Sequence, residues 1–237
     1  MSADQNKNLT RREFVQLGIK AAATVALAGP IAQIADAAVP SPRKPNVVFI
    51  FADQMRAASM GCMGNADVKT PNMDKLAKQG VLFSNCISTY PVCTPYRACL
   101  LTGKFPTTTG VVANGVELQN SGETIADVLK GQGYKTGYIG KWHLEKHNQP
   151  FVPKDRRQGF DYWAVRNNGG PHWDSFYCMD TEDPVPMKGY VPDAATDLAV
   201  GFVEKNAKDP FCQKVSGQLG RSPPVNRAVR GLNSCPT

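Results

Sequence analysis

The sequence lacks Cys-x-x-Cys pairs and zinc-ligand spacings, and these absences argue against a disulfide scaffold and a zinc module. Its seven cysteines are an odd number, and no two of them have Cys-x-x-Cys spacing. No cysteine and histidine spacing typical of zinc sites occurs either. We therefore expect neither a disulfide scaffold nor a zinc module. The 237 residues suffice for one sizeable hydrophobic core.

The sequence also lacks a lysine and arginine cluster in its central part, although its formal net charge is +7. Four of these charges come from Gln213–Thr237, which contains no acidic residue, and one comes from residues 1–37. Residues 38–212 therefore carry a net charge of only +2. Since nucleic-acid-binding surfaces are usually basic patches, we expect no nucleic-acid partner.

No hydrophobic run is long enough to cross a bilayer as a mature helix, but the N-terminal residues resemble an export signal. Arg11 and Arg12 stand in a context typical of twin-arginine signals. A mild apolar run, Ala21–Ala28, follows them, and Ala35–Ala37 is a small-residue cleavage pattern. We predict that residues 1–37 are a signal peptide read by the twin-arginine export machinery, so that the mature chain is periplasmic or secreted. The alternative is an unstructured basic N-terminus.

Strand and helix patterns alternate through the centre of the chain. Val47–Phe51 is short, apolar and β-branched, as is typical of a strand buried on both faces. Thr70–Gly80 has helix start and stop signals and an apolar stripe, formed by Met73, Leu76 and Ala77, that we expect to be buried. Further elements are expected at Val81–Asn85 (strand), Thr124–Lys130 (helix), Lys135–Ile139 (strand) and from Pro192 onwards (helix). This order predicts βαβ units around a mostly parallel sheet.

A possible nucleophile stands at the start of another predicted helix, Cys93–Gly103. Pro95 suits its first turn, and Gly103 fits just past its end. Cys93 then lies where free N–H groups and the positive end of the helix dipole attract an anion, with Arg97 one turn away. The alternative is that Cys93 is a small buried side chain.

Two further groups of polar residues follow predicted strands. Asp53 and Gln54 come directly after the first strand, where a carboxylate and an amide oxygen can bind a hard cation. Lys141 and His143 follow the strand 135–139, two residues apart, so in an extended chain both would point to one side. Together they would make an anion site with a proton carrier. The alternatives are a loop-capping aspartate and a solvated loop.

Cys-Thr-Pro-Tyr-Arg at residues 93–97, followed by Leu-Thr-Gly at 101–103, resembles the first signature of the sulfatase family. Residues 133–143, Gly-Tyr-Lys-Thr-Gly-Tyr-Ile-Gly-Lys-Trp-His, resemble the second. The resemblance implies an α/β sandwich of the alkaline-phosphatase-like type with a mostly parallel central sheet.

The resemblance also implies a site. A formylglycine-generating enzyme would oxidise Cys93 to formylglycine, whose hydrated aldehyde is the nucleophile. Asp53, Gln54 and the converted Cys93 would bind Ca²⁺. Arg97 and Lys141 would stabilise negative charge, and His143 would carry a proton. The implied reaction is hydrolysis of a small-molecule or carbohydrate sulfate ester.

The pattern changes after Lys208–Phe211. In sulfatases a hydrophobic strand and a Pro-His turn follow, whereas residues 213–237 here are rich in Arg, Ser, Pro and Gly. We therefore predict that residues 38–212 are the N-terminal part of a sulfatase domain, and that residues 213–237 are an aberrant, disordered tail. The family's remaining half supplies an Asp-Asn pair for the metal, a further lysine and a C-terminal subdomain. We expect the chain as given to be truncated and catalytically defective.

Two alternative functions stay open. One is a phosphoesterase or phosphonate hydrolase of the same superfamily, and the other is a non-catalytic truncated product. The loop Asn168–Asp174 either lines the substrate pocket or is structural, with His172 exposed to water.

Overall fold

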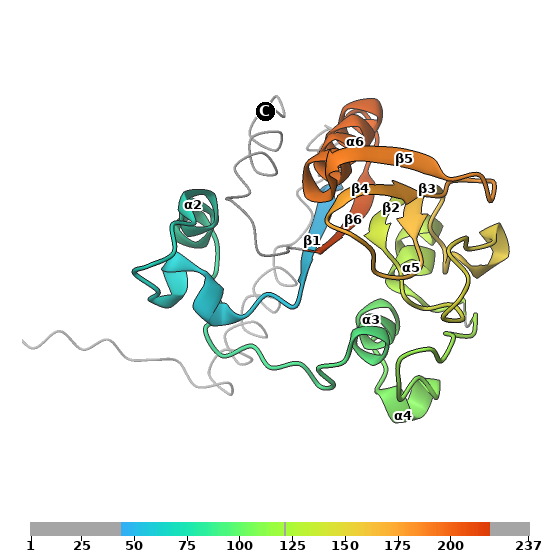
Figure 1. The fold of residues 1–237 in the computed structure, drawn as a ribbon, viewed down its shortest axis with the longest axis horizontal. Helices are drawn as coiled ribbons and strands as arrows, with labels where there is room; N and C mark the ends of the chain where they lie inside the picture. Colours follow the sequence, from blue (N-terminus) through green and yellow to red (C-terminus); the bar gives the residue numbers. More distant parts are fainter. Residues whose placement is uncertain (1–43, 121, 219–237) are drawn as a thin grey trace, which may run out of the picture. The chain divides into compact units, whose positions relative to one another are not determined.

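The computed structural model describes residues 44–120 and 122–218. The predicted signal peptide and residues 219–237 of the predicted tail lie outside them. No helix in these two ranges is long and apolar enough to cross a membrane. The elements, labelled in Figure 1, are β1 (Val47–Asp53), η1 (Ala57–Ser59), η2 (Gly61–Met63), α2 (Pro71–Gln79), α3 (Cys93–Thr102), α4 (Pro106–Thr109), α5 (Ile125–Gly131), β2 (Lys135–Lys141), η3 (Lys154–Arg156), β3 (Tyr162–Arg166), β4 (Trp173–Tyr177), β5 (Val185–Tyr190), α6 (Val191–Asn206) and β6 (Phe211–Gln218).

The central sheet has the strand order β1-β6-β2-β3, and every neighbouring pair in it is parallel. The predicted α/β class with a mostly parallel sheet is therefore confirmed. A second sheet consists of β4 and β5, which pair antiparallel. Because all strands of the central sheet run the same way, their carboxyl ends share one edge, where polar side chains can meet.

Apolar side chains cover both faces of the central sheet. Tyr138 of β2 belongs to a core cluster with Ala98 of α3 and Ala126 of α5. The next residue, Ile139, belongs to a second cluster with Ala195 of α6. Since successive strand residues point to opposite faces, α3 and α5 cover one face and α6 covers the other. This is the layered arrangement that alternating strands and helices predict.

Two local predictions in residues 70–85 are wrong. Helix α2 forms as expected, but it has no buried residue, and 63% of Leu76 is exposed. Residues 81–83 form no strand, and 76% of Phe83 is exposed. Strand propensity expresses a fit to neighbouring strands, and the described residues provide none beside this segment.

The prediction that disorder begins at residue 213 is also wrong for residues 213–218. These residues complete β6, which lies between β1 and β2 and pairs with both. Gln213 is fully buried, and its Nε2 donates to the carbonyl oxygen of Ala199 at 3.0 Å. Main-chain pairing on both sides therefore stabilises a strand whose composition alone did not indicate one.

Candidate active site

The carboxyl end of β1 meets the first turn of α3. Cys93 is the first helical residue, and its Sγ lies 3.9 Å from Oδ1 of Asp53. The N-cap residue Val92 has no capping side chain, but Asn114 accepts a hydrogen bond from the Thr94 N–H at 3.0 Å. The predicted position of the thiol at the start of a helix is therefore confirmed, with a carboxylate beside it.

Two cations surround the Asp53 carboxylate. Nζ of Lys141, the last residue of β2, lies 2.7 Å from Oδ2, and Nη2 of Arg97 lies 3.6 Å from the same oxygen. Burial alone would raise the pKa of Asp53, but the hydrogen bond and charge of Lys141 and the charge of Arg97 lower it overall. The three groups carry a net charge of one positive unit, which favours an anionic ligand.

Arg97 also joins three elements of the fold. Its side chain is fully buried, and Nη1 donates to Tyr138 Oη, the Lys141 carbonyl oxygen and Ser216 Oγ at 3.2, 2.8 and 2.7 Å. The guanidinium lies over the ring of Phe51, 5.1 Å from its centroid. Sequence reasoning missed the roles of Tyr138 and Ser216. Ser216 lies in the segment that was expected to be disordered, and no sequence signal indicated it.

His143 lies in the same cluster, but not in the expected geometry. Strand β2 ends at Lys141, and His143 has a left-handed φ of 61°, so strand alternation does not apply to it. Only 7% of His143 is exposed, and its Nδ1 has no hydrogen-bond partner in residues 44–120 and 122–218. Burial, followed by the charges of Lys141 and Arg97, lowers the pKa of His143 to about 4. The imidazole is therefore neutral at pH 7 and can accept a proton.

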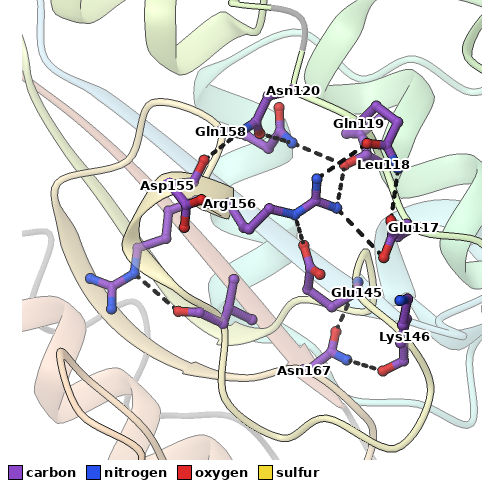
Figure 2. A network of polar contacts seen from close by, with 12 residues as sticks. Glu117, Leu118, Gln119, Asn120, Glu145, Lys146, Asp155, Arg156, Gln158 and Asn167 are labelled. Carbon is purple, nitrogen blue, oxygen red and sulfur yellow. Dashed lines mark hydrogen bonds and ion pairs between the residues drawn. The ribbon is translucent and has the colours of Figure 1, made fainter.

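A polar network holds the loop that follows β2 (Figure 2). Arg156 Nε donates to Glu145 Oε1 at 3.0 Å, and its Nη2 donates to the Leu118 carbonyl oxygen at 3.1 Å. The side chain of Asn167 accepts from the Glu145 N–H and donates to the Lys146 carbonyl oxygen. The carbonyl oxygen of Asn167 accepts from the His143 N–H at 2.6 Å. The network thus fixes the main chain on which His143 stands, and sequence reasoning did not find it.

The remaining predicted site residues are less enclosed. Gln54 follows β1 with a left-handed φ of 59° and an exposed side chain. No group of three or more His, Cys, Asp and Glu side chains suited to a metal occurs in the part of the chain that the structure describes. Asp53 and Gln54 are adjacent hard oxygen donors, so they fit part of a calcium shell. His172 is exposed, and its carbonyl oxygen accepts from the Val191 N–H.

Fold and site together define an α/β protein of the alkaline-phosphatase-like type, with an anion-attracting cluster at the carboxyl edge of its parallel sheet. The sulfatase family model matches residues 45–216, and the chain belongs to the sulfatase family.

Three comparisons illustrate this membership. An ulvan-active sulfatase from Formosa agariphila is 44% identical over 183 aligned residues, and the match covers 74% of this chain and 35% of the relative. An N-acetylglucosamine-6-O-sulfatase from Bacteroides thetaiotaomicron is 35% identical over 192 residues, covering 77% and 33% of the two chains. A Bacteroides fragilis structure assigned to the sulfatases superposes with a TM-score of 0.71 at 36% identity, covering 76% of this chain and 44% of that one. The chain spans about a third of the length of these two sequence relatives.

Proposed function

We propose that this chain carries the nucleophile side of a sulfatase active site that hydrolyses carbohydrate sulfate esters, R–O–SO₃⁻ + H₂O → R–OH + HSO₄⁻. The observation that carries the proposal is the convergence of Cys93, Asp53, Arg97 and Lys141 at one edge of the sheet. Nucleophilic attack on a sulfate ester requires such groups: a nucleophile, a carboxylate and two cations that stabilise negative charge.

Side chains of this chain would provide the modified residue and the ligands of the metal. Oxidised to formylglycine, Cys93 would supply a hydrated aldehyde as nucleophile at the start of α3. Asp53 and Gln54 would hold Ca²⁺, which as a Lewis acid would polarise the sulfate oxygens. Asp53 suits this role because its lowered pKa keeps it ionised at neutral pH.

The other residues have roles that follow from their charge. Arg97 and Lys141 stabilise the negative charge of the transferred sulfate, and both are held by contacts that do not depend on the ligand. His143, neutral at pH 7, would be the proton acceptor for a hydroxyl of the hydrated aldehyde. Its orientation depends on the loop network of Figure 2.

The proposed substrate class rests on the names of the relatives. They include an ulvan-active sulfatase, two Bacteroides sulfatases named for N-acetylglucosamine and N-acetylgalactosamine, and a structure with D-glucosamine-2-N,6-O-disulfate. Steryl-sulfatases from mouse, rat and human match over about half of this chain, as does the sulfatase named for N-acetylgalactosamine. The ulvan-active and N-acetylglucosamine sulfatases match over about three quarters of it, and these longer matches favour a carbohydrate.

Conversion of Cys93 is the first test. Co-expressed with a formylglycine-generating enzyme, the chain should give a Cys93 peptide whose mass shows the aldehyde. A Cys99→Ser variant, changed in the same helix, should be converted equally well, whereas Cys93→Ala should not. An unmodified Cys93 thiol, in a cell where a control sulfatase is converted, would contradict the proposal.

A chimera tests the reaction. Residues 45–216 would replace the corresponding part of the ulvan-active sulfatase that is 44% identical. The soluble, converted chimera should release sulfate from saccharide sulfates, and its Cys93→Ala form should not. A preference for phosphate esters would favour the phosphoesterase alternative, and a folded, converted but inactive chimera would refute the proposed sulfate-ester hydrolysis.

A further inference from the structure

We propose that Trp173 and Tyr190 form a stacking platform for a sugar ring, and that the ligand is an oligosaccharide extending beyond the sulfated residue. This inference rests on the proposed function, because it specifies the substrate class of the same protein. It concerns residues outside the cluster around Asp53.

The two rings lie side by side on the second sheet. Trp173 of β4 pairs with Tyr190 of β5, and the ring centroids are 5.3 Å apart with an interplanar angle of 42°. Trp173 is 56% exposed, while the other two tryptophans of the chain, Trp142 and Trp163, are 0% and 2% exposed. A large aromatic side chain is thus held against a second ring with much of its surface open to solvent. Such a surface suits an apolar ligand face.

The main chain around Trp173 is fixed before any ligand binds. The register shifts between Trp173 and Ser175, and the intervening Asp174 has a left-handed φ of 49°. Oδ1 of Asp174 accepts from the Gly189 N–H at 2.8 Å, and the Val191 N–H donates to the His172 carbonyl oxygen at 2.9 Å. Hydrogen bonds therefore fix the residues on both sides of Trp173. A prearranged aromatic surface loses little conformational entropy on binding.

The platform is connected to the active-site loop by a short segment. In that loop, the carbonyl oxygen of Asn167 accepts from the His143 N–H. Trp173 follows six residues later, and an extended chain spans at most about 3.6 Å per residue, which limits this separation to about 22 Å. A ligand of a few sugar units is long enough to reach from the active-site loop to the platform.

The surroundings of Trp173 favour a sugar over a steroid. The neighbouring His172, Asp174 and Lys188 are exposed polar residues, so the indole is an open face with a polar rim. A pyranose ring presents C–H groups on one face and hydroxyl groups around its edge, which matches an aromatic face within such a rim. A steroid nucleus is apolar on all sides and binds best in an enclosed apolar pocket.

Tryptophan fluorescence gives a direct test on the chain as it exists. Because Trp142 and Trp163 are buried, acrylamide should quench chiefly Trp173. Oligosaccharides prepared from ulvan, carrageenan and chondroitin sulfate would be used in sulfated and chemically desulfated form, with a steryl sulfate as comparison. We expect at least one oligosaccharide pair to protect Trp173 from quenching, in both forms, and the steryl sulfate to give no protection.

Matched variants decide whether the platform binds the sugar, with affinity measured by titration calorimetry. Trp173→Ala should weaken oligosaccharide binding about tenfold, corresponding to about 1.4 kcal/mol, while Trp173→Phe keeps an aromatic face and should lose less. Phe83→Ala removes another exposed ring, at a position outside helices and strands, and should have no effect.

The inference would be overturned if the wild type and Trp173→Ala bound the oligosaccharides with equal affinity, or if no oligosaccharide protected Trp173 from quenching. The ring pair would then be only a structural contact between β4 and β5. Binding of desulfated oligosaccharides that depends on Trp173 would support the platform even if the chimera releases no sulfate. The two proposals can therefore fail separately.

Discussion

Lys214 lies in the central strand β6, and only 3% of its surface is exposed. Its Nζ has no hydrogen-bond partner among the described residues and lies over the rings of Tyr138 and Phe49, 5.2 and 5.8 Å from their centroids. Burial, followed by the charge of Arg97, lowers the pKa of Lys214 well below its usual value of 10.5. Replacing this amine by the thioether of Lys214→Met should therefore stabilise the fold.

The expected magnitude follows from proton linkage. An unfolded chain binds the Lys214 proton up to a pH near 10.5, whereas the folded chain releases it at a lower pH. Between these two pKa values the free energy of unfolding rises with pH by about 1.4 kcal/mol per unit, and it falls as pH decreases. Over two pH units within this window, the wild type should gain up to about 2.7 kcal/mol that Lys214→Met does not gain.

Urea unfolding followed by circular dichroism at pH 7, 8 and 9 measures this difference. The Lys214→Met variant should be more stable than the wild type at pH 7, and the difference should shrink as pH rises. Lys135→Met, which removes an exposed amine from the neighbouring strand β2, is the control and should keep the wild-type pH dependence. Parallel pH dependences of the wild type and Lys214→Met would refute the reasoning.

Three further outcomes are expected. Gly140 has a φ of 101°, and an added Cβ would lie 2.0 Å from a main-chain oxygen of β6. Gly140→Ala should therefore lower the free energy of unfolding, measured in urea, by more than about 3 kcal/mol. The control Gly131→Ala has open space around the added Cβ and should lower it far less. Because the pKa of His143 is lowered to about 4, its imidazole should stay neutral from pH 8 down to about 5 in NMR titrations, and protonation near pH 6.5 would contradict the site geometry. Changing Arg11 and Arg12 together to Lys should retain the protein in the cytoplasm, as fractionation would show, and unchanged export would refute the signal-peptide prediction.

The predictable part of the candidate site came from residues that follow strands or begin helices. Asp53, Cys93 and Lys141 could be placed together because the carboxyl ends of parallel strands share an edge, and the structure brings them within contact distance. The geometry of His143 was not predictable, since its left-handed φ is a property of one residue held by a loop network. The contacts of Arg97 with Ser216 were not predictable either, because 119 residues separate them.

Local sequence determined the features that depend on short-range chemistry. Cap and stop residues defined α3, with Gly103 at a left-handed φ of 67°, and α5, with Thr124 in a capping box. Alternation of strands and helices determined the parallel sheet. Only the tertiary structure decided that Phe211–Gln218 is a central strand and that Val81–Asn85 is not a strand, because a strand is stabilised by its neighbours in the sheet. The same long-range packing buried Lys214 and aligned Trp173 with Tyr190, and no local pattern of residues encodes either arrangement.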